Sequence, residues 1–407
     1  MDDIGRSYLT LALHLNRHFE GFVDAYFGQE ELKAEVEAGQ PRSPQDLAHD
    51  ASELQAAIKA SDYDPQLKEY LLGQMRAMSA VVRKLSGEEF DLVQEAELYF
   101  DISPEMADES VLEDFRRTMD SLLPGKGSLG ERAVAWEKSV EIDEDRLLAA
   151  CERMVREART RTRALFDLPP DEEVSLALAE NQPWQAYNRY LGGGRSRIEV
   201  NTDVPMGMGD LVPAMPHETY PGHHTDLAIK AHLLYRGEGR WEHSLLTTGP
   251  QAVVSEGMAM WAWEMIFEDD ELADFLREDL YPLAGVHVDN VERDIAIMRV
   301  ASVGSVGVVD GNAALLIHKD GWSLEEAREY LVHYGLITPE RAAKSIEFAM
   351  DPLWRAYTFN YGAGRQLLAP LLEGPDRRAN FARLLSEPFT PSQVRQWVAE
   401  YEKGIES

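Results

Sequence analysis

Hydrophobic residues in the first 170 positions recur at steps of three and four, which is the spacing of one face of an α-helix. The segment 64–85 shows this most regularly, with hydrophobic positions at Leu67, Leu71, Met75, Met78, Val82 and Leu85. Ser43 followed by Pro44 is typical of a helix start, because serine caps the first turn and proline fits its first position. Residues 143–166 are a further amphipathic stretch. These patterns predict a helical N-terminal region over residues 1–170.

After Pro169 and Pro170 the pattern changes to an alternation with a period of two, which is typical of β-strands. Residues 173–179 and 196–202 alternate in this way, and three consecutive glycines, 192–194, separate two strand-like runs. We predict a small antiparallel sheet with a glycine hairpin. The glycines lack the GxxxxGK[ST] pattern, so they do not indicate a phosphate-binding loop.

Helical signals return after about residue 209, in agreement with a mainly α fold. Capping boxes and proline-marked helix starts are found at Ser323 with Glu326, Thr390 with Gln393, and Thr338 with Pro339. We therefore expect an N-terminal helical region, 1–170, and a second region, 171–407, with the small sheet and the candidate site. The two regions could also form one continuous unit.

Charge and cysteine content exclude several classes of protein. The 407 residues include 40 basic and 72 acidic ones, for a net charge of −32, which argues against nucleic acids and anionic membranes as partners. The single cysteine excludes an intramolecular disulfide and a cysteine-based zinc finger. The N-terminal stretch has no basic region of a secretory signal, and the weakly polar run 300–309 is too short to span a bilayer. We expect a cytoplasmic protein, whose oligomeric state the sequence leaves open.

Three of the 11 histidines lie within the eight residues 217–224, HETYPGHH. Neutral imidazole is the commonest metal ligand, and a carboxylate such as Glu218 next to it can act as the general base for a metal-activated water. In a regular helix His217 and His223 would be separated by roughly 9 Å of rise and could not bind one ion. Pro221 and Gly222 predict a broken helix that returns His223, or less readily His224, to the metal. The alternative is a plain kink with surface histidines.

A third ligand is expected from the apolar segment 253–265, VVSEGMAMWAWEM. Glu256 lies at the start of this segment, and buried carboxylates are usually paired or bound to metal. The alternative is a glutamate that stabilises a helix start through the helix dipole.

These residues resemble a large bacterial family known only as a domain of unknown function, whose hallmark is HExYPGHH followed by an E-G segment. The resemblance covers roughly residues 180–370 and continues through 320–331, DGWSLEEAREYL, and 351–368, DPLWRAYTFNYGAGRQLL. The family is similar to zinc metallopeptidases of the gluzincin type. More distant similarities are to dipeptidyl peptidase III and to carboxypeptidase Taq, which has a mainly helical fold with a small sheet.

The resemblance implies one Zn²⁺ per chain, bound by His217, His223 and Glu256, with Glu218 as general base. His224 would contact these ligands without binding the metal itself. Family members often carry an oxyanion-stabilising tyrosine in an SYKIG segment. The corresponding text here is one residue longer, which leaves two candidates, Tyr357 and Tyr361. Two further departures are Pro216 before the first histidine and EGMAMWAWE in place of EGWALYAE.

The sequence thus predicts a helical zinc-metallopeptidase-like hydrolase that cleaves short peptides; zinc is only the default metal for these ligands. The alternatives are an amidohydrolase with a non-peptide substrate and a metal-binding helical scaffold without turnover. We expect strand 197–202 to be an edge strand on which an extended peptide adds. Asn201 on this strand and Arg365 are candidate substrate-binding residues, although an ordinary ion pair is the competing interpretation of Arg365.

Overall fold

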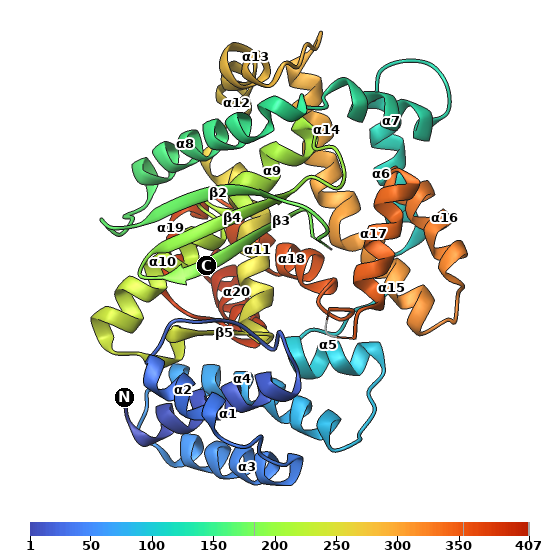
Figure 1. Cartoon of the computed structure of the whole chain (residues 1–407). Helices are drawn as coiled ribbons and strands as arrows, with labels where there is room; N and C mark the ends of the chain where they lie inside the picture. Colours follow the sequence, from blue (N-terminus) through green and yellow to red (C-terminus); the bar gives the residue numbers. More distant parts are fainter. Residues whose placement is uncertain (183, 353, 406–407) are drawn as a thin grey trace.

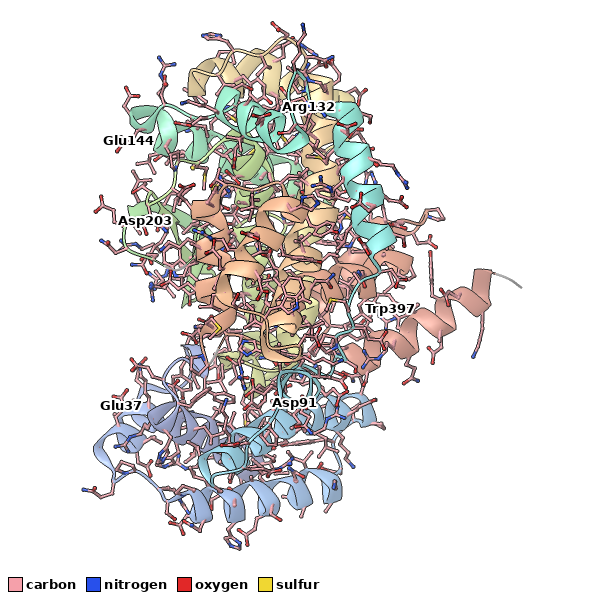
Figure 2. All side chains as sticks on the ribbon, turned by 90° about the vertical axis from the view of Figure 1, so that its right-hand side faces the viewer. Glu37, Asp91, Arg132, Glu144, Asp203 and Trp397 are labelled. Carbon is pink, nitrogen blue, oxygen red and sulfur yellow. The ribbon has the colours of Figure 1, made fainter. Side chains whose placement is uncertain are left out.

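Helices make up most of the chain in the computed structural model, which describes residues 1–182, 184–352 and 354–405 (Figure 1). The mainly α fold with a small sheet is therefore confirmed. In both views the blue N-terminal helices lie below the rest of the molecule (Figures 1 and 2). In Figure 2 the C-terminal helix projects from the side of the molecule beyond Trp397.

The N-terminal helices surround one hydrophobic core. They are α1 (Asp3–His18), α2 (Glu30–Ala38), α3 (Pro44–Ala60), α4 (Pro65–Leu85) and α5 (Leu92–Phe100). Four of the predicted hydrophobic positions of α4 are buried: Leu71, Met75, Met78 and Val82. The other two, Leu67 and Leu85, are partly buried. Ser43 caps α3 by accepting a hydrogen bond from the Asp46 N–H, as predicted. Strand β1 (Val23–Tyr26) pairs antiparallel with β5 (Leu245–Thr247), which joins this part of the chain to the second half.

Helices α6 (Glu109–Leu122), α7 (Leu129–Ser139) and α8 (Leu147–Leu165) contribute to a second core, which they share with side chains from beyond residue 200. The predicted amphipathic stretch 143–166 is α8, preceded by a short 3₁₀ turn. Both cores combine side chains from before and after residue 170. The division of the chain at this residue stays a prediction.

The central sheet contains β2 (Glu173–Ala179), β3 (Ala186–Gly192) and β4 (Arg195–Asn201), in the order β2–β4–β3. The predicted glycine hairpin joins β3 and β4, and Gly192, Gly193 and Gly194 all have positive φ angles that favour glycine. Strand β2, however, pairs parallel with β4. The prediction of a purely antiparallel sheet was therefore wrong, because alternation reveals the two faces of a strand but not its neighbour.

The order of the strands also corrects the expected peptide-binding edge. Strand β4, which contains most of 197–202, is the central strand and is hydrogen-bonded on both sides. Its backbone is already used within the sheet, so an extended peptide cannot add to it. Strand β3 is an edge of this sheet instead.

The second half of the chain is helical, as predicted. Its helices are α9 (Met208–Glu218), α10 (His223–Lys230), α11 (Pro250–Ile266), α12 (Asp269–Phe275), α13 (Tyr281–Ala284), α14 (Val291–Gly304), α15 (Asp310–His318), α16 (Leu324–Gly335), α17 (Pro339–Met350), α18 (Phe359–Leu372), α19 (Arg377–Ser386) and α20 (Pro391–Ile405). The predicted helix starts at Ser323, Thr338 and Thr390 are confirmed. Helix α11 runs through the middle of the molecule, and α18 lies beside it (Figure 1).

Two glycines let α11 and α18 approach each other closely. A Cβ atom at Gly257 would lie 2.5 Å from the carbonyl oxygen of Gly364, and one at Gly364 would lie 2.2 Å from that of Val253. This contact sets Glu256 of α11 against the segment that carries Tyr357 and Tyr361.

One helical stretch among the described residues, Val291–His318, is long and apolar enough by length and composition to cross a membrane. It comprises α14, a π-helical turn at Ser305–Val309 and α15, and 56% of its most apolar window is buried. The weakly polar run 300–309 belongs to this stretch, and the helical stretch extends beyond the run on both sides. Helices of a protein core pass the same test.

Candidate metal centre

The octapeptide 217–224 forms a helix, a turn and a second helix, as predicted. Helix α9 ends at Glu218 and α10 begins at His223, and the Tyr220–Pro221 peptide bond between them is cis. The N–H of Gly222 donates to the carbonyl of Pro216 at 3.1 Å, and the N–H of Asp226 donates to the carbonyl of Gly222 at 3.0 Å. The chain is thereby folded back on itself, so that His223 lies beside His217.

Three side chains from three helices converge at this turn. Glu256 Oε2 lies 3.3 Å from His217 Nε2 and 3.5 Å from His223 Nε2, and the three ligand atoms all lie within 4.8 Å of one another. Atoms bound tetrahedrally to zinc at about 2.0–2.1 Å lie roughly 3.3–3.4 Å apart. Glu256 Oε2 is buried and has no hydrogen-bond partner among the described residues. The donor set and its spacing therefore fit a zinc ion.

Hydrogen bonds hold the ligands in this orientation. His223 Nδ1 lies 3.2 Å from Ser255 Oγ, which donates to Asp226 Oδ2 at 3.2 Å, so the other ring nitrogen faces Glu256. Burial lowers the pKa of His223, but the attraction of Glu256 outweighs it and raises that pKa to about 9. Burial also raises the pKa of Glu256, yet His223 and His217 lower it overall. The pocket thus favours a positive charge between these side chains.

Glu218 lies next to the three ligand residues without being one of them. Its Oε1 atom is 4.0 Å from His217 Nε2, and the side chain is largely buried. Burial, together with repulsion by Glu256, raises the pKa of Glu218, although both histidines oppose this. Asn188 of β3 donates from Nδ2 to the Glu218 carbonyl at 2.7 Å and so fixes the end of α9 against the sheet. A carboxylate placed here, with a raised pKa, is suited to act as a general base.

Both candidate tyrosines reach the centre. The Tyr357 hydroxyl donates to Glu256 Oε1 at 2.7 Å, and the ring of Tyr361 stacks with that of His217 at a centroid distance of 6.3 Å. Burial, followed by repulsion from Glu256, raises the pKa of both hydroxyls. Both hydroxyls therefore stay protonated. The proton of Tyr357 is donated to Glu256 and would have to leave it to reach an oxyanion, and the choice between the two tyrosines as oxyanion-stabilising residue stays open.

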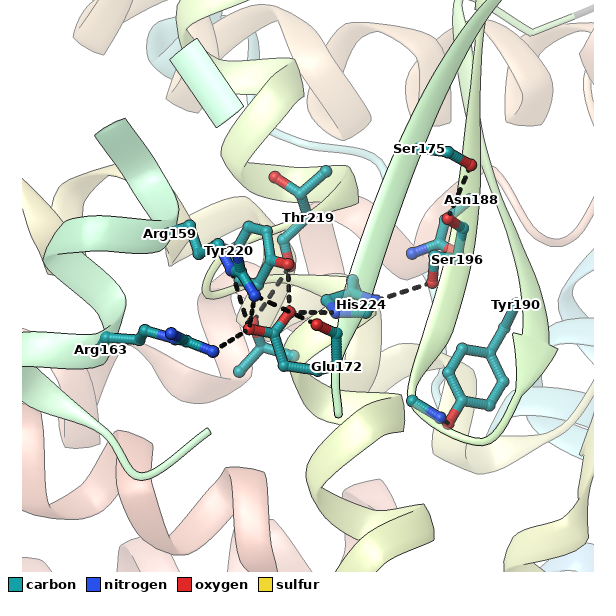
Figure 3. A network of polar contacts seen from close by, with 12 residues as sticks. Arg159, Arg163, Glu172, Ser175, Asn188, Tyr190, Ser196, Thr219, Tyr220 and His224 are labelled. Atoms are coloured by element: carbon teal, nitrogen blue, oxygen red, sulfur yellow. Dashed lines mark hydrogen bonds and ion pairs between the residues drawn. The ribbon is translucent and has the colours of Figure 1, made fainter. Parts of the chain in front are cut away.

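His224 is not one of the three grouped ligands and lies in a buried network centred on Glu172 (Figure 3). His224 Nδ1 lies 2.8 Å from Ser196 Oγ, and its Nε2 lies 3.2 Å from Glu172 Oε2. Glu172 also accepts hydrogen bonds from the Tyr220 hydroxyl and from both guanidinium groups shown in the figure. His224 is thus held by this network, which leaves His223 as the second histidine of the metal group.

The Glu172 network joins three parts of the chain to the turn of the octapeptide. Arg159 and Arg163 come from α8, Glu172 precedes β2, and Ser196 belongs to β4. Burial alone raises the pKa of Glu172, but hydrogen bonds from His224, Tyr220 and Arg159 outweigh it and lower the pKa to about 2. The carboxylate therefore stays ionised and anchors residues 220–224.

We expect Glu172→Gln to bind zinc about tenfold more weakly than the parent protein. A neutral amide cannot accept hydrogen bonds from His224, Tyr220 and two arginines together, so the turn that presents His223 loses its anchor. A competition titration against a chromophoric chelator measures the affinity without any need for turnover. Glu173→Gln, at the exposed neighbouring position, is the matched control. Equal zinc affinities in the two variants would contradict this role.

The two predicted substrate-binding residues are engaged elsewhere. Asn201 donates from Nδ2 to the carbonyls of Gln182 and Trp184, at 3.0 and 2.9 Å, and so holds the loop after β2. Arg365 lies over the ring of Trp261 at 3.9 Å and donates to Glu264 Oε1 at 2.8 Å. The structure does not bring either side chain to the three ligands, and the ion-pair interpretation of Arg365 fits its contacts.

Four residues that shape this site were not predicted from the sequence: Asp24, Glu172, Asn188 and Ser255. Asp24 is exposed, accepts a hydrogen bond from the Tyr187 hydroxyl and lies close enough to His223 and Glu256 for their charges to affect its pKa. The only available signal was indirect, because buried Tyr220 and His224 need polar partners. Nothing in the order of residues identifies those partners.

Comparisons with known proteins show the fold but no family. No family model and no curated protein matches the chain. A protein from Colwellia psychrerythraea, provisionally named a lipoprotein, aligns with a TM-score of 0.53 and 15% identity over 91% of this chain and 70% of its own. A protein of unknown function from Shewanella oneidensis, also provisionally named a lipoprotein, aligns with a TM-score of 0.51 and 13% identity over 90% and 76%. At these identities the similarity supports a shared fold and nothing more.

Proposed function

We propose that the protein is a zinc-dependent hydrolase that cleaves the peptide bonds of short peptides. The observation that carries the proposal is the convergence of His217, His223 and Glu256, in which Glu256 Oε2 lies at the spacing of tetrahedral zinc ligands from both imidazoles, with the carboxylate of Glu218 just beyond them. The sequence alone supports a cytoplasmic location for this activity.

In this proposal each residue has a separate task. The chemistry that zinc supplies when bound is Lewis acidity, which lets a water molecule lose its proton near neutral pH. Glu218 accepts that proton and passes it to the leaving amine. A hydroxyl from Tyr357 or Tyr361 donates a hydrogen bond to the carbonyl oxygen as it gains negative charge. A protein that only binds metal needs no buried carboxylate in the position of Glu218. The presence of this carboxylate therefore favours a hydrolase over a metal-binding scaffold.

Burial of the centre favours short peptides as substrates. The side chains of His217 and His223 are only 14% and 16% exposed, and that of Glu256 is 6% exposed. A loop of a folded protein would have to be extended and inserted to reach these atoms, whereas a short flexible peptide can enter without unfolding.

Purified protein that has not been exposed to chelators should contain close to one zinc per chain, and His217→Ala should lose it. Removing one of three protein ligands leaves a site too incomplete to hold the ion through purification. Mass spectrometry of the metal content measures both proteins. His49→Ala is the matched control, since the side chain of His49 is 70% exposed on the N-terminal helix α3. Absence of metal even after zinc is supplied would reject the proposal.

A further inference from the structure

A segment of the N-terminal half, residues 24–27, lies against the edge strand of the central sheet. Strand β1 pairs with β5, and Figure 1 shows the blue chain of this segment beside β5, below the sheet. The Tyr187 hydroxyl of β3 donates to Asp24 Oδ1, and the ring of Phe27 packs edge-on against that of Tyr190 at a centroid distance of 4.9 Å. Side chains three positions apart in a strand point to opposite faces. A segment that contacts both tyrosines therefore lies across the free edge of β3 and closes it.

The closed edge adjoins the metal ligands. Asn188, which lies between the two tyrosines, donates to the Glu218 carbonyl at 2.7 Å. The charge of His223 lowers the pKa of Asp24 and that of Glu256 raises it, so Asp24 lies close to both ligands. A substrate with its scissile bond at the centre therefore meets this segment on one side. An endopeptidase needs room for the chain on both sides of the scissile bond, so closure of one side favours removal of residues from a chain end.

Asp24 supplies an unpaired carboxylate at this closed side. The residue is exposed to solvent, and among the described residues it has no ion-pair partner and a single hydrogen bond, from the uncharged hydroxyl of Tyr187. The guanidinium of Arg189 also lowers the pKa of Asp24, but it is paired with Glu199 at 3.1 Å. Desolvation by the surrounding protein outweighs these contacts and raises the pKa of Asp24 overall, so its negative charge is incompletely compensated. A bound cation would supply the missing partner.

The two ends of a peptide differ in charge, and the carboxylate of Asp24 is complementary to the ammonium group of the amino end. We propose that Asp24 binds the α-ammonium group of the substrate, so that the protein removes residues from the amino end of short peptides. The inference rests on the proposed peptidase function and adds to it the direction of attack. The competing interpretation is recognition of the carboxyl end by Arg189, and the experiment below includes that outcome.

The test compares one pentapeptide that has both ends free with its N-acetylated and C-amidated forms. Acetylation removes the charge that Asp24 binds, so we expect kcat/KM to fall by about 10- to 100-fold. Amidation should change kcat/KM little. Mass spectrometry of the products should show that residues are released from the amino end first.

Three variants separate the charge of Asp24 from its structural role. Asp24→Asn still accepts a hydrogen bond from Tyr187 but has no charge, so kcat/KM for the free peptide should fall by about 10- to 100-fold, mainly through KM. Its zinc content and its kcat/KM for the acetylated peptide should not change. Tyr187→Phe keeps the carboxylate and should keep the preference for the free amine. Glu20→Gln, at an exposed position just before β1, is the matched control and should behave as the parent protein.

Equal kcat/KM values for the free and acetylated peptides would overturn the inference, and so would a preference for the free amine that survives in Asp24→Asn. A loss of cleavage on amidation instead of acetylation would also overturn it and would assign the closed side to the carboxyl end. If none of the peptides is cleaved, the proposed function has failed, and calorimetric binding of the free and acetylated peptides to the parent protein and to Asp24→Asn tests the ammonium site by itself. Equal affinities would reject that site, whereas tighter binding of the free peptide by the parent protein alone would support it.

Discussion

Replacing Glu218 by glutamine should lower the kcat for a cleaved peptide by about 10²- to 10⁴-fold and leave the zinc content unchanged. Glutamine has nearly the same shape as glutamate but cannot take up a proton. The side chain of Glu218 is not one of the three ligands that converge on one point, and its Oε1 atom lies 4.0 Å from His217 Nε2. Steady-state kinetics and metal analysis of the same preparation provide both measurements.

Glu218→Asp is the matched variant, because it keeps the carboxylate but withdraws it by one methylene group. We expect its turnover to lie between those of the parent protein and Glu218→Gln, with zinc retained in all three. Unchanged turnover in the glutamine variant would eliminate Glu218 as the general base. Loss of zinc in that variant would instead make Glu218 a ligand and would require a different base.

The parts of the site that the sequence predicted are those fixed by local chemistry. Pro221 and Gly222 lie within the octapeptide itself, so the break between α9 and α10 followed from residues next to each other. Glu256 was predictable because a carboxylate in a strongly apolar segment needs a partner. The structure brings all three predicted metal ligands together across 39 positions of sequence, with Glu218 beside them.

The parts that the sequence did not predict depend on contacts between distant segments. Glu172 is one of 72 acidic residues and lies 52 positions before its partner His224, so no spacing marks it. The same reason explains the sheet, where β4 is inserted between β2 and β3. An asparagine and an arginine can both bind a peptide substrate, which is why Asn201 and Arg365 were candidates. In the structure Asn201 instead binds two backbone carbonyls, and Arg365 binds Glu264 and stacks on Trp261. These partners become neighbours only through the fold.

The position of Gly222 makes a second large effect predictable. A Cβ atom there would lie 1.9 Å from the carbonyl oxygen of His217 and 2.6 Å from that of Pro216. The φ angle of Gly222 is −74°, outside the positive range that favours glycine, so the argument for glycine at this position is the close approach. Gly222→Ala must therefore push α10 away from α9, which separates His223 from His217 and Glu256.

We expect Gly222→Ala to lower the free energy of unfolding by about 1–3 kcal/mol and to weaken zinc binding by more than tenfold. Urea unfolding and a zinc competition titration measure the two effects. Gly130→Ala in α7 is the matched control, because a Cβ atom at that position would meet no atom within 4 Å, and alanine there should leave zinc affinity unchanged and stability equal or higher. If both variants bound zinc as the parent does, the metal centre would not depend on the close packing of the turn. The fit of His217, His223 and Glu256 to one ion would then need another explanation.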